Sequence, residues 1–226
     1  MKTVGILGGM GPLATADLYT KIILSTAAAG DGAHVPLLIS SRPDIPDRAA
    51  SIDGRGESAL PALKAEARRL EQAGAQGLCL GCNTAHYYFD DIQKAVSVPI
   101  LHMPRLTAAF CRERGIEKAL LLAAPGTYRA GIYEQAFVGT GIILVRPEEK
   151  VQRLTAQCIY EGIKGGRRDF DPQELRRELE TVSLPVILGC TELPIAFDWY
   201  RLPGDTIDPG AILAREVVRF AGGVCR

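Results

Sequence analysis

LGCNTAH, the stretch from Leu80 to His86, follows a short apolar run at residues 77–80 that has the length and composition of a buried strand. Gly81 lets the chain turn sharply, so Cys82 is predicted to lie at the carboxyl end of this strand. Open α/β sheets bind ligands at that edge, and the backbone amides of a following helix favour a thiolate there. The stretch therefore predicts an α/β fold with a thiol that faces a ligand.

The same design occurs a second time, where the stretch from Pro185 to Glu192 reads PVILGCTE. A second apolar run ending in Leu-Gly-Cys predicts a second strand, with Cys190 at its carboxyl end. Two equivalent thiols predict two equivalent halves of the structure.

The elements predicted from hydrophobic periodicity follow one order in both halves: strand, glycine turn, helix, strand, helix, strand, cysteine turn and helix. Strands are expected at residues 3–7, 35–40, 77–80, 98–102, 119–123, 142–145, 185–188 and 206–209, and helices at 13–28, 57–73, 87–96, 131–137, 149–164, 172–181 and 211–220. Strands that alternate with helices predict parallel sheets with helical crossovers. We therefore expect two α/β domains related by a pseudo-twofold axis, residues 1–104 with 208–226 and residues 105–207, with an active-site cleft between them.

The composition is that of an ordinary globular protein, with 47% hydrophobic and 23% charged residues in a chain of 226. Lys and Arg total 26, as do Asp and Glu, and basic residues form no long run, so neither nucleic acid nor a membrane surface is an expected partner. The N-terminus does not resemble a signal peptide, and no segment has the length of a bilayer span. We therefore expect a cytoplasmic protein.

Two local patterns have alternative interpretations. Cys79 and Cys82 form C-x-x-C, but no further closely spaced ligands follow, so no metal site is expected and a redox pair remains a minor alternative. The glycine-rich turn from Gly8 to Pro12 could hold a phosphate, yet Ala14 stands where a dinucleotide fingerprint has its third glycine. The other interpretation of this turn is a tight bend that lets a substrate approach the backbone closely.

If the two halves present their strand ends to one cleft, Cys82 and Cys190 flank a substrate from opposite sides. Two thiols so placed can remove a proton from one face of a carbon and return one to the other face, which inverts a stereocentre. The carbon acid is weak, so preorganised donors and cations must stabilise the charge that develops. The candidates for this role are the amides and side chains of Asn83, Thr84 and Thr191, and the cations Arg48, on the loop at residues 41–48, and Lys164. For the Asn and Thr residues the alternative is helix capping, and for the arginine it is a solvated surface position.

Five stretches together resemble the aspartate/glutamate racemase superfamily, and most of all its aspartate racemase branch. They are GILGGMGPLAT at 5–15, IPDR at 45–48, GCNTAH at 81–86, YEGIK at 160–164 and GCTE at 189–192. The resemblance implies a two-base racemase that needs no pyridoxal phosphate or other cofactor, acts on an acidic amino acid and is often a homodimer. It also implies a two-domain α/β structure.

Carried over by motif, the resemblance makes Cys82 and Cys190 the acid/base pair, with Cys190 taking the proton from the L enantiomer and Cys82 from the D enantiomer. It places the remaining residues around the substrate: Asn83, Thr84 and Thr191 at the α-carboxylate, Met10 and Thr127 along the cleft, and Arg48 and Lys164 at the side-chain carboxylate. Glu192 stands where glutamate racemases carry a histidine, and we count it among the substrate-binding residues. The two cations favour aspartate as the substrate.

Other functions fit the same residues. A related enzyme could racemise glutamate or a broader set of amino acids, or isomerise or decarboxylate a small diacid. A catalytically idle amino-acid-binding protein would also have two domains and a cleft, since a fold does not specify a function. Exchange of the α-proton with solvent distinguishes the racemases from the binding protein.

Overall fold

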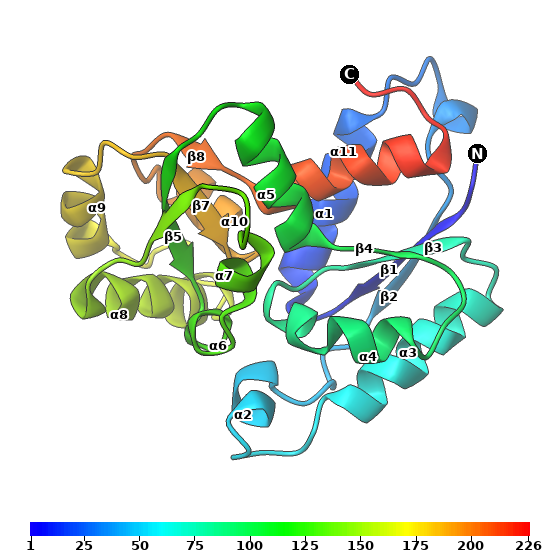
Figure 1. Cartoon of the computed structure of the whole chain (residues 1–226), viewed down its shortest axis with the longest axis horizontal. Helices are drawn as coiled ribbons and strands as arrows, with labels where there is room; N and C mark the ends of the chain where they lie inside the picture. Colours follow the sequence, from blue (N-terminus) through cyan, green and yellow to red (C-terminus); the bar gives the residue numbers. More distant parts are fainter. The chain divides into compact units, whose positions relative to one another are not determined.

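The computed structural model describes residues 1–226, which cluster into two compact units. Unit 1 comprises Met1–Met103 and Gly210–Arg226, and unit 2 comprises Pro104–Pro209. Each unit contains one sheet of four parallel strands with helices beside it (Figure 1). The predicted fold class, two α/β units built on parallel sheets, is confirmed.

The sheet of unit 1 has the strand order β2-β1-β3-β4. Its strands are β1 (Val4–Gly8), β2 (Leu37–Ser41), β3 (Gly77–Leu80) and β4 (Ile100–Leu101). Helices α1 (Pro12–Ser25) and α11 (Pro209–Ala221) cover one face, and α3 (Leu60–Gln72) and α4 (Phe89–Gln93) cover the other (Figure 1). Because both faces are covered, β1 and β3 are buried throughout, which explains why their sequences are continuous apolar runs.

Unit 2 repeats this topology with the strand order β6-β5-β7-β8. Its strands are β5 (Lys118–Ala123), β6 (Ile143–Val145), β7 (Val186–Gly189) and β8 (Thr206–Ile207). Its main crossover helices are α8 (Glu149–Gln157) and α9 (Gln173–Glu180). The two cysteine motifs therefore follow equivalent strands, β3 and β7, each of which lies directly beside the first strand of its unit.

Several helices differ from the predicted ranges. Helix α1 ends at Ser25 rather than at residue 28, because Thr26 leaves the helix and forms an antiparallel bridge with Cys225. Helix α3 begins at Leu60 rather than at residue 57. Pro61 lies in its first turn, a position that suits proline. The helix expected at residues 87–96 is a 3-10 helix, η2 (Thr84–Tyr88), followed by the short α4.

Some segments expected to be turns or loops are helical. The additional elements are η1 (Asp31–Ala33), α2 (Arg48–Ile52), α5 (Met103–Glu113), α6 (Pro125–Arg129) and α10 (Leu193–Trp199). The helix expected at residues 131–137 is present as α7 (Ile132–Ala136). Helix α2 begins because the Asp47 carboxylate accepts a hydrogen bond from the Ala50 amide at 2.8 Å, which is an N-cap that the loop interpretation overlooked. None of the helices combines the length and apolar character needed to cross a lipid bilayer.

Candidate active site

The strand order of unit 1 reverses at β1, because the chain leaves β1 for β2 on one side and returns to β3 on the other. Ligands of open α/β sheets bind at the carboxyl ends of strands at such a switch point. Leu7 of β1 is in register with Leu80 of β3, and the Gly81 amide donates to the Leu7 carbonyl at 2.9 Å. The turn after β1 and the turn that carries Cys82 therefore lie side by side.

Backbone groups of the glycine turn after β1 form hydrogen bonds within the protein. Gly9 has a positive φ of 90°, and a Cβ atom there would collide with the backbone of Arg42. The Gly9 amide donates to Thr15 Oγ1 at 2.8 Å, and that hydroxyl donates to the Gly11 carbonyl at 2.9 Å. The turn therefore packs closely against the backbone of Arg42, and its Gly9 amide is engaged by a side chain of the same unit.

Cys82 is buried, with 6% of its surface exposed, and belongs to one apolar cluster with Met10, Ile45 and Tyr88. Two of the residues predicted to lie together, Cys82 and Met10, are thus brought together within unit 1. Asn83 precedes η2 but its side chain makes no capping hydrogen bond, so the helix-capping alternative does not apply to it. Thr84, which is 8% exposed, is the first residue of η2.

His86 supports the cysteine turn, a role that we did not predict. Its Nδ1 atom lies 3.0 Å from the Cys82 carbonyl and 3.2 Å from the Asn83 carbonyl, and its Nε2 atom accepts the Met103 amide at 3.2 Å. Carbonyl oxygens only accept, so Nδ1 carries the proton and Nε2 is unprotonated. The spacing of Cys82 and His86, four residues apart with His86 inside η2, is the sequence signal for such a side-chain to backbone bond.

Arg48 is buried rather than solvated, with 8% of its surface exposed. Its Nη1 atom donates to the carbonyls of Ile45 and Pro46, each at 2.9 Å, and its Nη2 atom lies 3.5 Å from the Met10 carbonyl. Arg48 therefore stands beside the turn after β1, in the same unit as Cys82. The surface alternative is wrong for this residue because its guanidinium is buried against the carbonyl groups of the preceding loop and of the turn after β1.

In unit 2 the equivalent switch point lies between β5 and β7, where Ala123 is in register with Gly189. Cys190 follows β7 directly and is 6% exposed. Thr127 is fully buried in the first turn of α6, and its amide donates to the Ala124 carbonyl at 2.9 Å. Thr191, 7% exposed, follows the cysteine. The turns after β5 and β7 thus place these residues at one edge of the sheet.

A buried carboxylate contacts the second thiol. The Cys190 Sγ atom donates to Glu192 Oε2 at 3.0 Å, and Glu192 is 2% exposed. The Lys164 ammonium lies 3.9 Å from Glu192 Oε1. Burial raises the pKa of the Cys190 thiol well above its usual value, the negative charge of Glu192 raises it further, and Lys164 opposes both effects. The thiol is therefore held in its protonated form, hydrogen-bonded to a buried carboxylate.

A π-helical turn carries Lys164 to this carboxylate. The helix expected to be continuous over residues 149–164 is α-helical only to Gln157 and continues as the π-helix η3 (Cys158–Ile163). The Lys164 amide accordingly bonds the Ile159 carbonyl at 2.9 Å. Such turns are frequent at functional sites, and the extra residue in the turn rotates the side chains that follow it around the helix axis. Periodicity alone did not predict it, because the insertion leaves the apolar pattern almost intact.

The cysteines other than Cys82 and Cys190 are Cys79, Cys111, Cys158 and Cys225. Cys79 is fully buried within β3, and burial raises its pKa to about 12, so it is a poor thiolate. All six cysteines are free thiols, Cys79 and Cys82 included. No cluster of three or more His, Cys, Asp or Glu side chains is arranged as a metal site.

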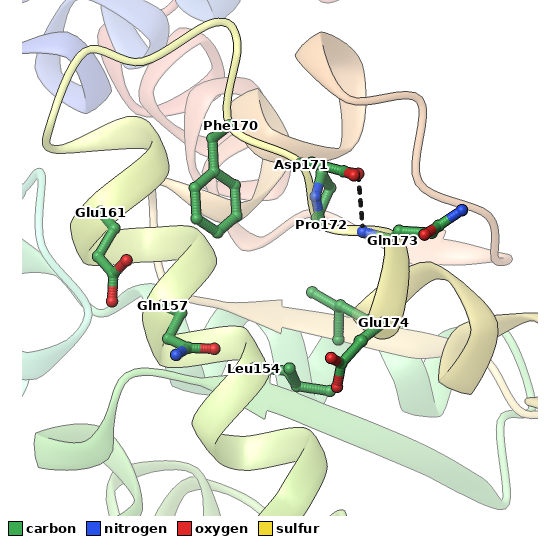
Figure 2. A pocket seen from close by; sticks show the side chains of 9 residues that line it. Leu154, Gln157, Glu161, Phe170, Asp171, Pro172, Gln173 and Glu174 are labelled. Atoms are coloured by element: carbon green, nitrogen blue, oxygen red, sulfur yellow. Dashed lines mark hydrogen bonds between the residues drawn. The ribbon is translucent and has the colours of Figure 1, made fainter.

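A separate hollow of about 280 Å³ opens on unit 2 between η3 and the start of α9. Figure 2 shows Phe170 between the helical turn that carries Glu161 and the segment that leads into α9. Its lining residues are Leu154, Gln157, Glu161, Phe170, Asp171, Pro172, Gln173, Glu174 and Leu175. None of the residues predicted from the sequence to form the site lines this hollow.

Two α/β units, each with a cysteine turn at its topological switch point, define a class of proteins that can perform acid–base chemistry with thiols. A family model described as Asp/Glu/Hydantoin racemase matches residues 7–217. The chain therefore belongs to the Asp/Glu/Hydantoin racemase family.

Individual relatives agree with this assignment. Aspartate racemase of Picrophilus torridus is 30% identical with a TM-score of 0.84, over 100% of this chain and 96% of that one. An aspartate racemase homologue from Pyrococcus horikoshii OT3 is 29% identical with a TM-score of 0.77, over 98% and 100% of the two chains. The broad specificity amino-acid racemase RacX of Bacillus subtilis is 28% identical over 95% of this chain and 96% of its own.

Proposed function

We propose that this protein is a cofactor-independent amino-acid racemase that interconverts L- and D-aspartate by a two-base mechanism. The observation that carries the proposal is the contact between the Cys190 thiol and the buried Glu192 carboxylate, at a strand end equivalent to that of Cys82. The carboxylate lies within proton-transfer distance of the thiol, which is the geometry that general acid/base chemistry requires. A binding protein would have no need of this pair.

In the proposed reaction Glu192 first takes the thiol proton of Cys190, which leaves a thiolate. That thiolate removes the α-proton of L-aspartate while the Cys82 thiol delivers a proton to the opposite face of the same carbon. Cys82 is left as the thiolate and Glu192 as the acid, and loss of the Glu192 proton to solvent with uptake of one by Cys82 completes the cycle. One C–H bond breaks and another forms, so no oxidant or cofactor is consumed. The D-to-L direction uses the same steps in reverse, with Cys82 as the base. This scheme requires both sulfur atoms to reach one α-carbon in the substrate complex.

The substrate-binding roles follow from the charges and donors around each thiol. We assign the α-carboxylate to the amides and side chains of Asn83, Thr84 and Thr191, with Met10 and Thr127 as lining. The side-chain carboxylate is assigned to Arg48 and Lys164. Burial of Arg48 supports its assignment, since a desolvated guanidinium binds a carboxylate more strongly than a solvated one does.

A second candidate is a racemase of broader specificity. It is favoured by the engagement of both cations within the protein: Arg48 donates to two backbone carbonyls, and Lys164 lies 3.9 Å from Glu192. Cations that are already engaged discriminate less strongly for a diacid. RacX, described as a broad specificity racemase, is about as similar in sequence as the aspartate racemase of Picrophilus torridus.

The test is proton NMR of the purified protein with L-aspartate in deuterium oxide, with no added cofactor, followed by chiral chromatography. Loss of the α-proton signal together with formation of D-aspartate supports the proposal. The same assay with glutamate, alanine and other amino acids distinguishes the aspartate racemase from the broader enzyme. Release of carbon dioxide would instead identify a decarboxylase, and binding without exchange would identify an idle binding protein.

A further inference from the structure

We propose that Tyr88 and Tyr200 are equivalent positioning residues, each of which holds the cation of its own unit through a hydroxyl group. The inference rests on the proposed function, in which Arg48 and Lys164 bind the side-chain carboxylate. It assigns the preference for a diacid to two residues that do not touch the substrate.

In unit 1 the hydroxyl group of Tyr88 links the helix that begins at Arg48 to the segment that follows Cys82. Tyr88 is the last residue of η2, the 3-10 helix that begins two residues after Cys82. Its hydroxyl lies 2.5 Å from the Ser51 hydroxyl in α2, three residues after Arg48, the first residue of that helix. The Ser51 hydroxyl also accepts the Ala59 amide at 2.9 Å, which fixes its orientation. Helix α2 is thereby joined to η2 and to the segment that leads into α3.

In unit 2 an equivalent hydroxyl holds the lysine segment. Tyr200 follows α10, the helix that comes after Cys190, and its hydroxyl donates to the Arg167 carbonyl at 2.6 Å. Arg167 is three residues after Lys164, the same interval that separates Ser51 from Arg48. A Cβ atom at Gly162, in the π-turn, would lie 2.8 Å from the Tyr200 hydroxyl. The tyrosine therefore packs directly against the turn that directs Lys164.

The correspondence between the units argues against coincidence. Each tyrosine comes from the segment that follows a catalytic cysteine, is buried, with 7% of Tyr88 and 6% of Tyr200 exposed, and bonds a position three residues after a cation. A buried hydroxyl bond restrains the segment that carries the cation before substrate arrives. Preorganised segments lose less conformational freedom on binding, so the substrate carboxylate is bound more tightly.

The experiment compares Tyr88→Phe and Tyr200→Phe in the wild-type background, because each change removes one hydroxyl and keeps the buried ring. We expect KM for aspartate to rise about two- to tenfold in each variant, the range that corresponds to one net hydrogen bond, with little change in kcat. KM for alanine should stay within about twofold of the wild-type value. Alanine has no side-chain carboxylate, so it does not contact the cations that the two tyrosines position. Tyr87→Phe and Tyr19→Phe are the controls, because these rings are 51% and 41% exposed.

A partner mutation tests the pair in unit 1 directly. Ser51→Ala should raise KM for aspartate at least as much as Tyr88→Phe does, because it removes the bond to Tyr88 and also the acceptor of the Ala59 amide. The double variant should resemble Ser51→Ala, because the bond to Tyr88 is already lost in that variant. Thermal unfolding of every variant accompanies the kinetics. An additive effect in the double variant would contradict the pairing.

The outcomes separate this inference from the proposed function. If the wild-type protein turns over aspartate but both tyrosine variants keep its KM, the inference alone is overturned. An equal rise of KM for aspartate and alanine also overturns it, because a merely structural role would affect both substrates. If the wild-type protein neither racemises nor exchanges aspartate, the proposed function fails first, and this inference fails with it.

Discussion

The Sγ atom of Cys190 donates a hydrogen bond to Glu192 Oε2 at 3.0 Å, and both residues are buried. Cys82 has no acidic residue at the corresponding place, since Asn83 and Thr84 follow it. The two thiols stand at equivalent strand ends but in different electrostatic surroundings. In the proposed mechanism the proton of Cys190 leaves through Glu192, and this asymmetry leads to the predictions that follow.

Replacing Glu192 by Gln should lower kcat/KM about 100-fold, the lower end of the range for loss of a general base. The decrease should be the same in both directions, because enantiomers are equally stable and the equilibrium constant of racemisation is unity. Circular dichroism at a fixed wavelength follows both directions. The matched control is Glu161→Gln, an exposed carboxylate on the π-turn. Retention of full activity by Glu192→Gln would contradict the transfer of the Cys190 proton to Glu192.

Alkylation of Cys190 should begin at lower pH in Glu192→Gln than in the wild type. The thiolate is the reactive form, and the negative charge of Glu192 contributes to the raised pKa of Cys190. Removing that charge lowers the pKa, so thiolate forms at lower pH. Lys164→Met should shift the profile the other way, because the ammonium opposes the rise. Mass spectrometry of the Cys190 peptide after treatment with iodoacetamide across a pH series gives the midpoint. Identical alkylation midpoints in the wild type, Glu192→Gln and Lys164→Met would refute an electrostatic effect of these two residues on Cys190.

Single replacement of either motif cysteine should abolish racemisation. Cys82→Ala and Cys190→Ala each remove the proton carrier for one face, so both should lose at least about 100-fold in rate. Each can still exchange the α-proton of the one enantiomer whose base remains. By the proposed assignment Cys82→Ala exchanges L-aspartate and Cys190→Ala exchanges D-aspartate in deuterium oxide. Cys225→Ala, at a partly exposed cysteine outside the motifs, is the control. Full racemisation by both motif variants would rule out two bases.

Changes at His86 should impair activity through the turn that carries Cys82. His86→Ala removes the bond to the Cys82 carbonyl and leaves the buried Met103 amide without its acceptor, a loss of about 1 to 3 kcal/mol in unfolding free energy. His86→Asn keeps a donor near the Nδ1 position and should restore part of kcat but not the bond to Met103. Urea denaturation and kinetics measure the two effects separately. Equal kcat for the two variants would show that the carbonyl bond has no positioning role.

The stability of the fold should fall at alkaline pH in part because of Cys79. Burial raises its pKa to about 12 from a model-compound value of 9.0, so the folded state retains a proton that the unfolded chain releases. This contribution is fully present below pH 9 and is lost as the pH rises toward 12, by about 1.4 kcal/mol per pH unit. In Cys79→Ala the unfolding free energy should be lower at neutral pH, because of the cavity, but should decline less steeply above pH 9. If the unfolding free energy of Cys79→Ala fell with pH above pH 9 as steeply as that of the wild type, the loss of stability would not be due to Cys79.

Much of the fold could be predicted because its signals are local. Short apolar runs next to glycine identified β1, β3, β5 and β7, and the repeated Leu-Gly-Cys predicted that the two units share one topology. The helix ends were predicted less well. Thr26 leaves α1 to pair with Cys225, a contact between the two ends of the chain that no window of neighbouring residues contains. Similarly, the π-turn before Lys164 preserves the apolar face and so has no clear signature.

The sequence by itself determined that Cys82 and Cys190 end equivalent strands, because strand length, apolar runs and glycine turns depend on neighbouring residues. Only the tertiary structure decided what surrounds them. The burial of Arg48 against the turn after β1, the approach of Lys164 to Glu192 and the bond between Tyr88 and Ser51 all join segments that are distant in sequence. Such contacts depend on how helices pack against a sheet, and the energies of packing and desolvation act across the whole unit rather than along the chain.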